Sequence, residues 1–158
     1  MKNRPQVDFD PPLPSYVGNM IQVAARNARK NFDAGKSLPF LTQVAPETTT
    51  LVVTPLRGKE EYAELARMAL LAGCAVVLAA EVWLLEGQDV KLIGTGHPPV
   101  TPRLHPNRTE AVRLLLRLPT GREVTWMARI SRNPDLLGEW EHRVDSANPE
   151  KLQHRPIG

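Results

Sequence analysis

Cysteine is almost absent from this chain of 158 residues, since Cys74 is the single one. A lone cysteine has no partner for an internal disulfide and cannot form a thiolate metal cluster. Because Cys74 borders an apolar segment, we expect a small buried side chain there rather than a reactive thiolate. A protein without disulfides suits a reducing compartment, so we expect it in the cytoplasm.

Long apolar runs are absent too. No stretch reaches the roughly 18–20 apolar residues that cross a bilayer, which argues against a transmembrane helix. The basic start around Lys2 and Arg4 leads into Asp8, Asp10 and a group of prolines instead of the apolar core of a secretory signal. With 42% hydrophobic and 23% charged residues, the chain has the composition of one soluble globular domain, and we expect no membrane partner.

Recognisable signatures of chemistry are missing as well. The motif Gly94-Thr95-Gly96-His97 lacks the next glycine of a dinucleotide loop and the Lys-Ser/Thr of a phosphate-binding loop. The four histidines have no helix-fixed spacing for a metal, and no serine sits in a nucleophile elbow. We therefore predict no catalytic residues, no metal and no cofactor.

Basic charge is unevenly distributed along the chain. The segment 96–132 carries seven arginines against two glutamates, although the net charge of the whole chain is only +3. Arginine binds phosphate through two hydrogen bonds at once, which makes nucleic acid a candidate partner. Against this, the chain has only three Trp, two Tyr and three Phe, and no stacking pair falls on adjacent predicted strands.

Proline content and apolar periodicity predict an arm and two helices. Residues 1–14 contain four prolines and no periodicity, so we expect an extended N-terminal arm. Ser15 is the expected N-cap of a first helix that ends near Gly35, and a second helix runs from Gly58 to Gly73. The first helix has an apolar side and an opposite polar side formed by Asn19, Gln22, Arg26, Arg29 and Lys30.

Four strands are predicted from β-branched and apolar runs. They cover 48–54, 74–85 and the two arms of a hairpin, 111–118 and 124–132. The element order is then α-β-α-β-β-β. It predicts an α+β fold with a four-stranded mixed or antiparallel sheet and the helices on one face.

The remaining segments set the expected domain boundaries. A proline-bordered linker precedes the first strand, and about twenty residues after position 85 show little regular structure. Leu136, Leu137 and Trp140 belong to a tail that folds back on the domain. We therefore expect an arm over 1–14, a single domain over 15–145 and a flexible C-terminal tail over 146–158.

Side chains alternate between the two faces of each predicted strand. In the hairpin, one set is apolar and must meet the helices, whereas the other set holds Arg113, Met127 and Arg129. If Glu81 and Trp83 share that second face, they lie beside the arginines. We favour an ion pair between Glu81 and an arginine, with Trp83 under the tail or the first helix. The alternative is a recognition surface, because Trp, Met and Arg are frequent interface anchors.

Five short motifs lie between residues 75 and 141: Ala80-Glu81-Val82-Trp83, His105-Pro106-Asn107-Arg108, Glu110-Ala111-Val112, Ala128-Arg129-Ile130 and Leu137-Gly138-Glu139-Trp140-Glu141. In these motifs the chain resembles a family of uncharacterised bacterial and phage proteins with no assigned activity. The resemblance implies a shared fold and no function. It also implies that Glu81, Trp83 and the turn over 105–108 belong to one feature.

The candidate binding residues are those of the sheet surface and this turn: Glu81, Trp83, His105, Asn107, Arg108, Arg113, Met127 and Arg129. The leading hypothesis is a non-enzymatic protein-interaction or assembly module from phage or another mobile element, whose arm wraps a protein partner or a second copy of the chain. One alternative is a nucleic-acid-associated protein that uses the arginine face. The other is a small enzyme that uses Glu81 with His97 or His105.

Overall fold

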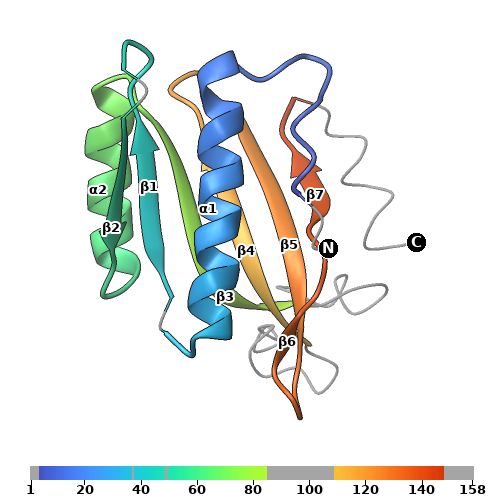
Figure 1. Ribbon diagram of the computed structural model, residues 1–158. Coiled ribbons are helices and arrows are strands. Elements are labelled where there is room, and N and C mark those ends of the chain that lie inside the picture. The colour runs from blue at the N-terminus through green and yellow to red at the C-terminus, as the bar shows by residue number, and fades with distance from the viewer. Residues whose placement is uncertain (1–3, 37, 49, 85–108, 148–158) are drawn as a thin grey trace, which may run out of the picture.

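The computed structural model describes residues 4–36, 38–48, 50–84 and 109–147. Within these ranges the strands form one sheet in the order β2-β1-β3-β4-β5-β6, with β7 beside β5, and every pair is antiparallel. The elements follow one another along the chain (Figure 1) as α1 (Ser15–Asp33), β1 (Phe40–Val44), β2 (Leu51–Pro55), α2 (Lys59–Leu71), β3 (Ala75–Leu84), β4 (Thr109–Arg117), β5 (Glu123–Ser131), β6 (Leu136–Leu137) and β7 (Glu141–Asp145).

The predicted fold class, α+β with a four-stranded sheet and both helices on one face, is wrong. The described residues form a sheet-dominated fold with seven antiparallel strands and one helix on each face. The three additional strands, β1, β6 and β7, have only two to five residues each. Such short segments contain too few residues to show a period. As a result, β1 falls in the expected linker, while β6 and β7 fall in the expected tail.

Strand β1 lies between β2 and β3 and runs antiparallel to both. The two outer strands are therefore parallel to each other, and parallel strands require a crossover connection. Helix α2 provides this crossover and packs on one face of the sheet. There Ala66 and Ala69 of the helix are buried with Leu41, Val76 and Leu78 of the strands. The expected order of strand, helix and strand is present, but the helix crosses over a strand, β1, that the sequence did not predict.

Helix α1 covers the opposite face of the sheet (Figure 1), where it packs on Val77, Leu114 and Trp126. It begins at Ser15 itself, with Pro14 at the N-cap and no side-chain cap, so the predicted serine cap is wrong. Neither helix in the described ranges has the length and apolarity needed to cross a bilayer. The buried residues of α1 recur every three or four positions, as an amphipathic helix requires: Val17, Met20, Ile21, Ala24, Ala25 and Ala28.

The predicted β-hairpin is confirmed by the pairing of β4 with β5. Its turn includes Gly121 with a φ of +96°, in the left-handed region that glycine adopts without a steric penalty. The apolar face of the hairpin lies under α1 and is inaccessible to solvent, with 0% exposure for Val112, Leu114, Leu116, Val124, Trp126 and Ala128. This part of the core follows directly from the alternating pattern in the sequence.

Residues 4–14, the described part of the predicted arm, lie on the protein's own sheet. The indole N–H of Trp126 donates a hydrogen bond to the Gln6 carbonyl at 2.8 Å. The Phe9 side chain is buried, and its ring centroid lies 4.6 Å from that of His142. Closer to the N-terminus, the Gln22 side-chain amide donates to the Pro5 carbonyl at 3.2 Å. This part of the arm is therefore built into the core.

A buried ion pair fastens the other end of the arm. Arg122, in the turn between β4 and β5, donates to both carboxylate oxygens of Asp145 in β7, at 3.1 and 2.8 Å. The Ala147 amide donates to the same carboxylate at 3.0 Å. Arg122 also donates to the Pro12 carbonyl at 3.3 Å. Because only 11% of the Arg122 side chain and 1% of the Asp145 side chain are exposed, solvent screens this pair poorly.

Removing the Asp145 charge tests how much the ion pair with Arg122 stabilises the fold. Burial alone would raise the pKa of the Asp145 carboxyl, but hydrogen bonds from Arg122 and Ala147 and the arginine charge hold it below its usual value. A lowered pKa adds stability above the ordinary value of about 3.9, and this stability is lost as the pH falls through the folded-state pKa. We expect Asp145→Asn to cost about 3–5 kcal/mol at pH 7, because it leaves Arg122 buried without its partner.

Urea unfolding of the wild type and the variant between pH 7 and pH 3 measures this effect. The difference between the two proteins should be largest near neutrality and shrink below about pH 4. Asp8→Asn is the matched control, because Asp8 is exposed and its loss should change stability by less than about 0.5 kcal/mol. Equal stability of Asp145→Asn and the wild type at pH 7 would contradict the account.

Candidate functional site

The structure divides the predicted site residues that it describes between the two faces of the sheet. Strand pairing places Glu81 opposite Val112 and Ala80 opposite Arg113. Because directly paired residues of antiparallel strands point to the same face, Glu81 lies on the α1 face and Arg113 on the α2 face. Met127 pairs with Arg113 and shares its face. The expected neighbourhood of Glu81 and Trp83 with Arg113 and Arg129 is therefore wrong. The turn residues His105, Asn107 and Arg108 lie outside the described residues.

Glu81 nevertheless contacts an arginine, as the favoured interpretation predicted, whereas Trp83, which that interpretation placed under the tail or the first helix, is 40% exposed. The partner is Arg132, in the turn that follows β5, and its Nη2 lies 3.8 Å from a Glu81 carboxylate oxygen. Arg132 binds Glu110 more closely, at 2.8 and 3.0 Å, and Asp135 at 3.1 Å. The hydrogen bonds that Arg132 donates to Glu110, together with the negative charges of Glu110 and Asp135, raise the pKa of Arg132 above its usual range. This cluster joins β3, β4 and the turn after β5, which is a structural role.

Arginines elsewhere on the sheet are also compensated. On the α2 face, Arg117 pairs with Glu123 at 2.9 Å, and Arg129 lies 3.7 Å from Glu141. Arg113 is half-buried on the same face. The described arginines that lie within 4 Å of an acidic side chain are Arg57, Arg67, Arg117, Arg122, Arg129, Arg132 and Arg143. The arginine-rich surface predicted from the sequence is therefore largely neutralised.

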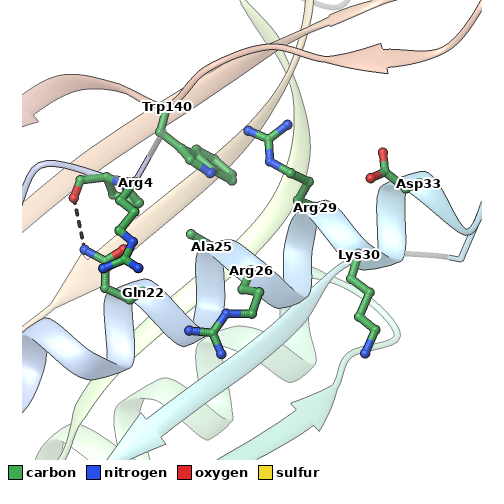
Figure 2. A pocket seen from close by; sticks show the side chains of 9 residues that line it. Arg4, Gln22, Ala25, Arg26, Arg29, Lys30, Asp33 and Trp140 are labelled. Atoms are coloured by element: carbon green, nitrogen blue, oxygen red, sulfur yellow. Dashed lines mark hydrogen bonds between the residues drawn. The ribbon is translucent and has the colours of Figure 1, made fainter. Parts of the chain in front are cut away.

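A hollow of about 500 Å³ lies between α1, the N-terminal arm and the segment 138–140, which we call the turn before β7. We call this hollow the basic groove. The arm contributes Arg4 and Pro5, Trp140 comes from the turn, and α1 contributes its polar side (Figure 2). The α1 residues that line the groove are Gln22, Ala25, Arg26, Arg29, Lys30 and Asp33. Four cationic side chains therefore surround this hollow, with Asp33 as the one acid that lines it.

Arg29 holds two walls of the basic groove together. Its guanidinium donates hydrogen bonds to the carbonyls of Leu137 at 2.8 Å and Gly138 at 2.6 Å. It also lies near Trp140 (Figure 2), 5.7 Å from the ring centroid. The Trp140 side chain is buried. Burial lowers the pKa of Arg29, although the charges of Asp33 and Glu139 act in the opposite direction. Arg29 thus fixes the turn before β7 on α1 and has little capacity left for a ligand.

The other three cations of the groove are different. Arg4, Arg26 and Lys30 are exposed, and none has an acidic side chain within ion-pair distance among the described residues. Arg26 and Lys30 are one helical turn apart and extend from the same side of α1 (Figure 2). Like charges held close together repel each other unless an anion lies between them. The basic groove is therefore suited to binding a negatively charged group.

Sequence reasoning identified the polar side of α1 but not the groove. Gln22, Arg26 and Lys30 could be assigned to one side of the helix from periodicity alone. The two other walls come from Arg4 and Trp140, which are separated by more than a hundred positions in the chain. Nothing in local composition links them. The only sequence signal was that three cations of α1 have one acid, Asp33, near them in the chain.

The described ranges contain no cluster of metal-ligating side chains, since no three His, Cys, Asp or Glu side chains in them lie together as ligands for a metal ion. Comparisons with protein-family models, curated proteins and solved structures find no match for the chain. The resemblance to bacterial and phage proteins described above therefore stays an expectation.

Replacing Arg29 and Arg26 one at a time distinguishes an arginine that stabilises the fold from one that lies on the surface. Arg29→Ala removes two hydrogen bonds from a charged donor and should lower the free energy of unfolding by about 2 kcal/mol. Arg26→Ala removes an exposed side chain without a partner among the described residues, so the change should stay within about 0.5 kcal/mol. Urea unfolding of both variants and the wild type measures the difference. Equal stability of the two variants would show that Arg29 does not fasten the turn.

Proposed function

We propose that this protein is a non-enzymatic protein-interaction module and that its basic groove binds an acidic segment of a protein partner. The observation that supports the proposal is the contrast in charge pairing. Most arginines of the sheet have an acidic partner, whereas Arg4, Arg26 and Lys30 have none among the described residues and surround one hollow. An acidic partner would supply the missing negative charge.

The shape of the groove supports a peptide segment rather than a broad surface. Its volume of about 500 Å³ is within the roughly 300–1,000 Å³ typical of ligand pockets and matches a few side chains. Carboxylates accept two parallel hydrogen bonds from one guanidinium, so Arg4 and Arg26 could each hold one acidic residue. Apolar atoms of Pro5, Ala25 and Trp140 line the hollow between the charges. They would exclude water and strengthen these contacts.

The two alternatives from the sequence have less support. A nucleic-acid-binding role for the sheet relied on its arginines, but Arg117 and Arg129 are paired with Glu123 and Glu141. In the groove, Trp140 has only 6% of its surface exposed and offers little area for base stacking. An enzyme based on Glu81 would need a carboxylate that is not held by an arginine. A cytoplasmic location and a phage or mobile-element origin stay part of the proposal on sequence grounds.

Charge reversal in the groove tests the proposal. The probe is a fluorescent peptide of alternating Asp and Glu, and fluorescence anisotropy measures its binding to the full chain. We expect Arg26→Glu combined with Lys30→Glu to weaken binding at least about tenfold, because two attractive contacts become repulsive. The matched control is Lys36→Glu with Arg67→Glu, which changes the net charge equally at exposed positions outside the groove and away from β2.

Two further probes make the result specific. The Asn/Gln counterpart of the peptide should not bind, and a single-stranded oligonucleotide should bind more weakly than the acidic peptide. Equal weakening by the groove variant and the control variant would show that binding follows net charge alone, against the proposal. Tight binding of the oligonucleotide without binding of the peptide would favour the nucleic-acid alternative.

A further inference from the structure

Strand β2, Leu51–Pro55, is an edge of the sheet with neither charged side chains nor a bulge. In the described part of the chain it pairs with β1 on one side and with no strand on the other. Its residues Leu51, Val52, Val53 and Thr54 are uncharged, and its pairing with β1 runs without a bulge. Val52 and Val53 point to opposite faces of the sheet, yet they are 46% and 45% exposed. An uncharged edge with exposed valines on both faces is a template for another strand.

The strands at the opposite end of the sheet, β6 and β7, have features that protect an edge from pairing. Strand β7 carries charged residues at Glu141, Arg143 and Asp145. Its pairing with β5 is interrupted by a register shift between Thr125 and Trp126. Strand β6, also at this end, has only two residues. Charges, irregular pairing and short length are the features by which natural sheets prevent edge-to-edge association. Strand β2 lacks charges and irregular pairing, although it has only five residues and ends with Pro55, which has no N–H to donate. Its first four residues are therefore the part of this edge that is open to association.

We propose that β2 pairs with β2 of a second copy of this chain, antiparallel and centred on Val53. In this arrangement Val53 lies opposite the same residue of the second copy, and Val52 lies opposite Thr54. A two-fold axis perpendicular to the sheet relates the copies, so one patch meets itself and the assembly closes as a dimer. The two sheets then continue as one, and each exposed valine gains a neighbour across the strands.

Charge at the ends of β2 favours a second copy over an unrelated strand. Antiparallel pairing brings the chain before β2 of one copy next to the chain after β2 of the other. Glu47 precedes the strand and is exposed, and Arg57 follows it with 95% of its side chain exposed. The two-fold axis therefore brings the segment that carries Glu47 near the segment that carries Arg57 at both ends of the paired strands, in addition to the contact of Arg57 with its own Glu61 at 3.9 Å. The paired edge is short, so we expect a dimer in the micromolar range.

Sedimentation velocity over a concentration series of the full chain tests the association. The wild type should shift from monomer to dimer across micromolar concentrations. We expect Val53→Lys to weaken the dimer at least about tenfold, because two ammonium groups would face each other across the axis. Thr120→Lys is the control with a similar added charge in the exposed turn between β4 and β5, away from β2. A monomeric wild type at all concentrations, or an unchanged dimer with Val53→Lys, would overturn the proposal.

Cross-linking tests the register. In a Cys74→Ser background, Val53→Cys should form a disulfide-linked dimer with diamide as the oxidant, because directly opposed side chains lie within disulfide reach. Val52→Cys is the matched control, since Val52 is equally exposed. In the proposed register it lies diagonally from the same residue of the second copy and should not form a cross-link. Equal cross-linking of both variants, or of neither, would overturn the proposed pairing.

Discussion

The arrangement of this protein depends on the hydrogen bond between the Trp126 indole and the Gln6 carbonyl. Trp126 is fully buried in β5, and a buried indole N–H needs an acceptor. The neighbouring backbone carbonyls belong to the sheet ladder, so the acceptor comes from the N-terminal arm at 2.8 Å. Phe9 then covers Trp126 and His142. Docking of the arm in turn places Arg4 and Pro5 beside α1, where they complete the basic groove.

The sheet surface and the basic groove differ in how their positive charges are compensated. Where the sheet meets solvent, glutamates opposite the arginines reduce the charge, as at Arg117 and Glu123. In the basic groove, Arg29 donates its hydrogen bonds to backbone carbonyls. These carbonyls are uncharged and do not neutralise the guanidinium. Exposed ion pairs such as that of Arg117 with Glu123 contribute little to stability. The uncompensated cations of the basic groove raise the electrostatic energy of the free protein, and an anionic partner would lower that energy.

The sequence predicted those parts of the fold in which a repeating pattern is long enough to read. The apolar stripe of α1 and the alternation in the hairpin extend over many residues, and both elements are present as predicted. Strands β1 and β6 are too short to show a pattern. The faces of β3 were misassigned because pairing one residue out of register exchanges the two faces of a strand. The register is set by long-range packing, so Glu81 was expected beside Arg113.

Hydrogen exchange at the three tryptophan indoles tests the central claim that the arm is docked on Trp126. In ¹⁵N–¹H spectra, with assignment by Trp126→Phe, we expect the Trp126 indole proton to exchange only when the domain unfolds. It should therefore exchange orders of magnitude more slowly than that of Trp83, whose side chain is 40% exposed. Exchange of the Trp126 indole as fast as that of Trp83 would show that the arm leaves this site and that the groove lacks its arm wall.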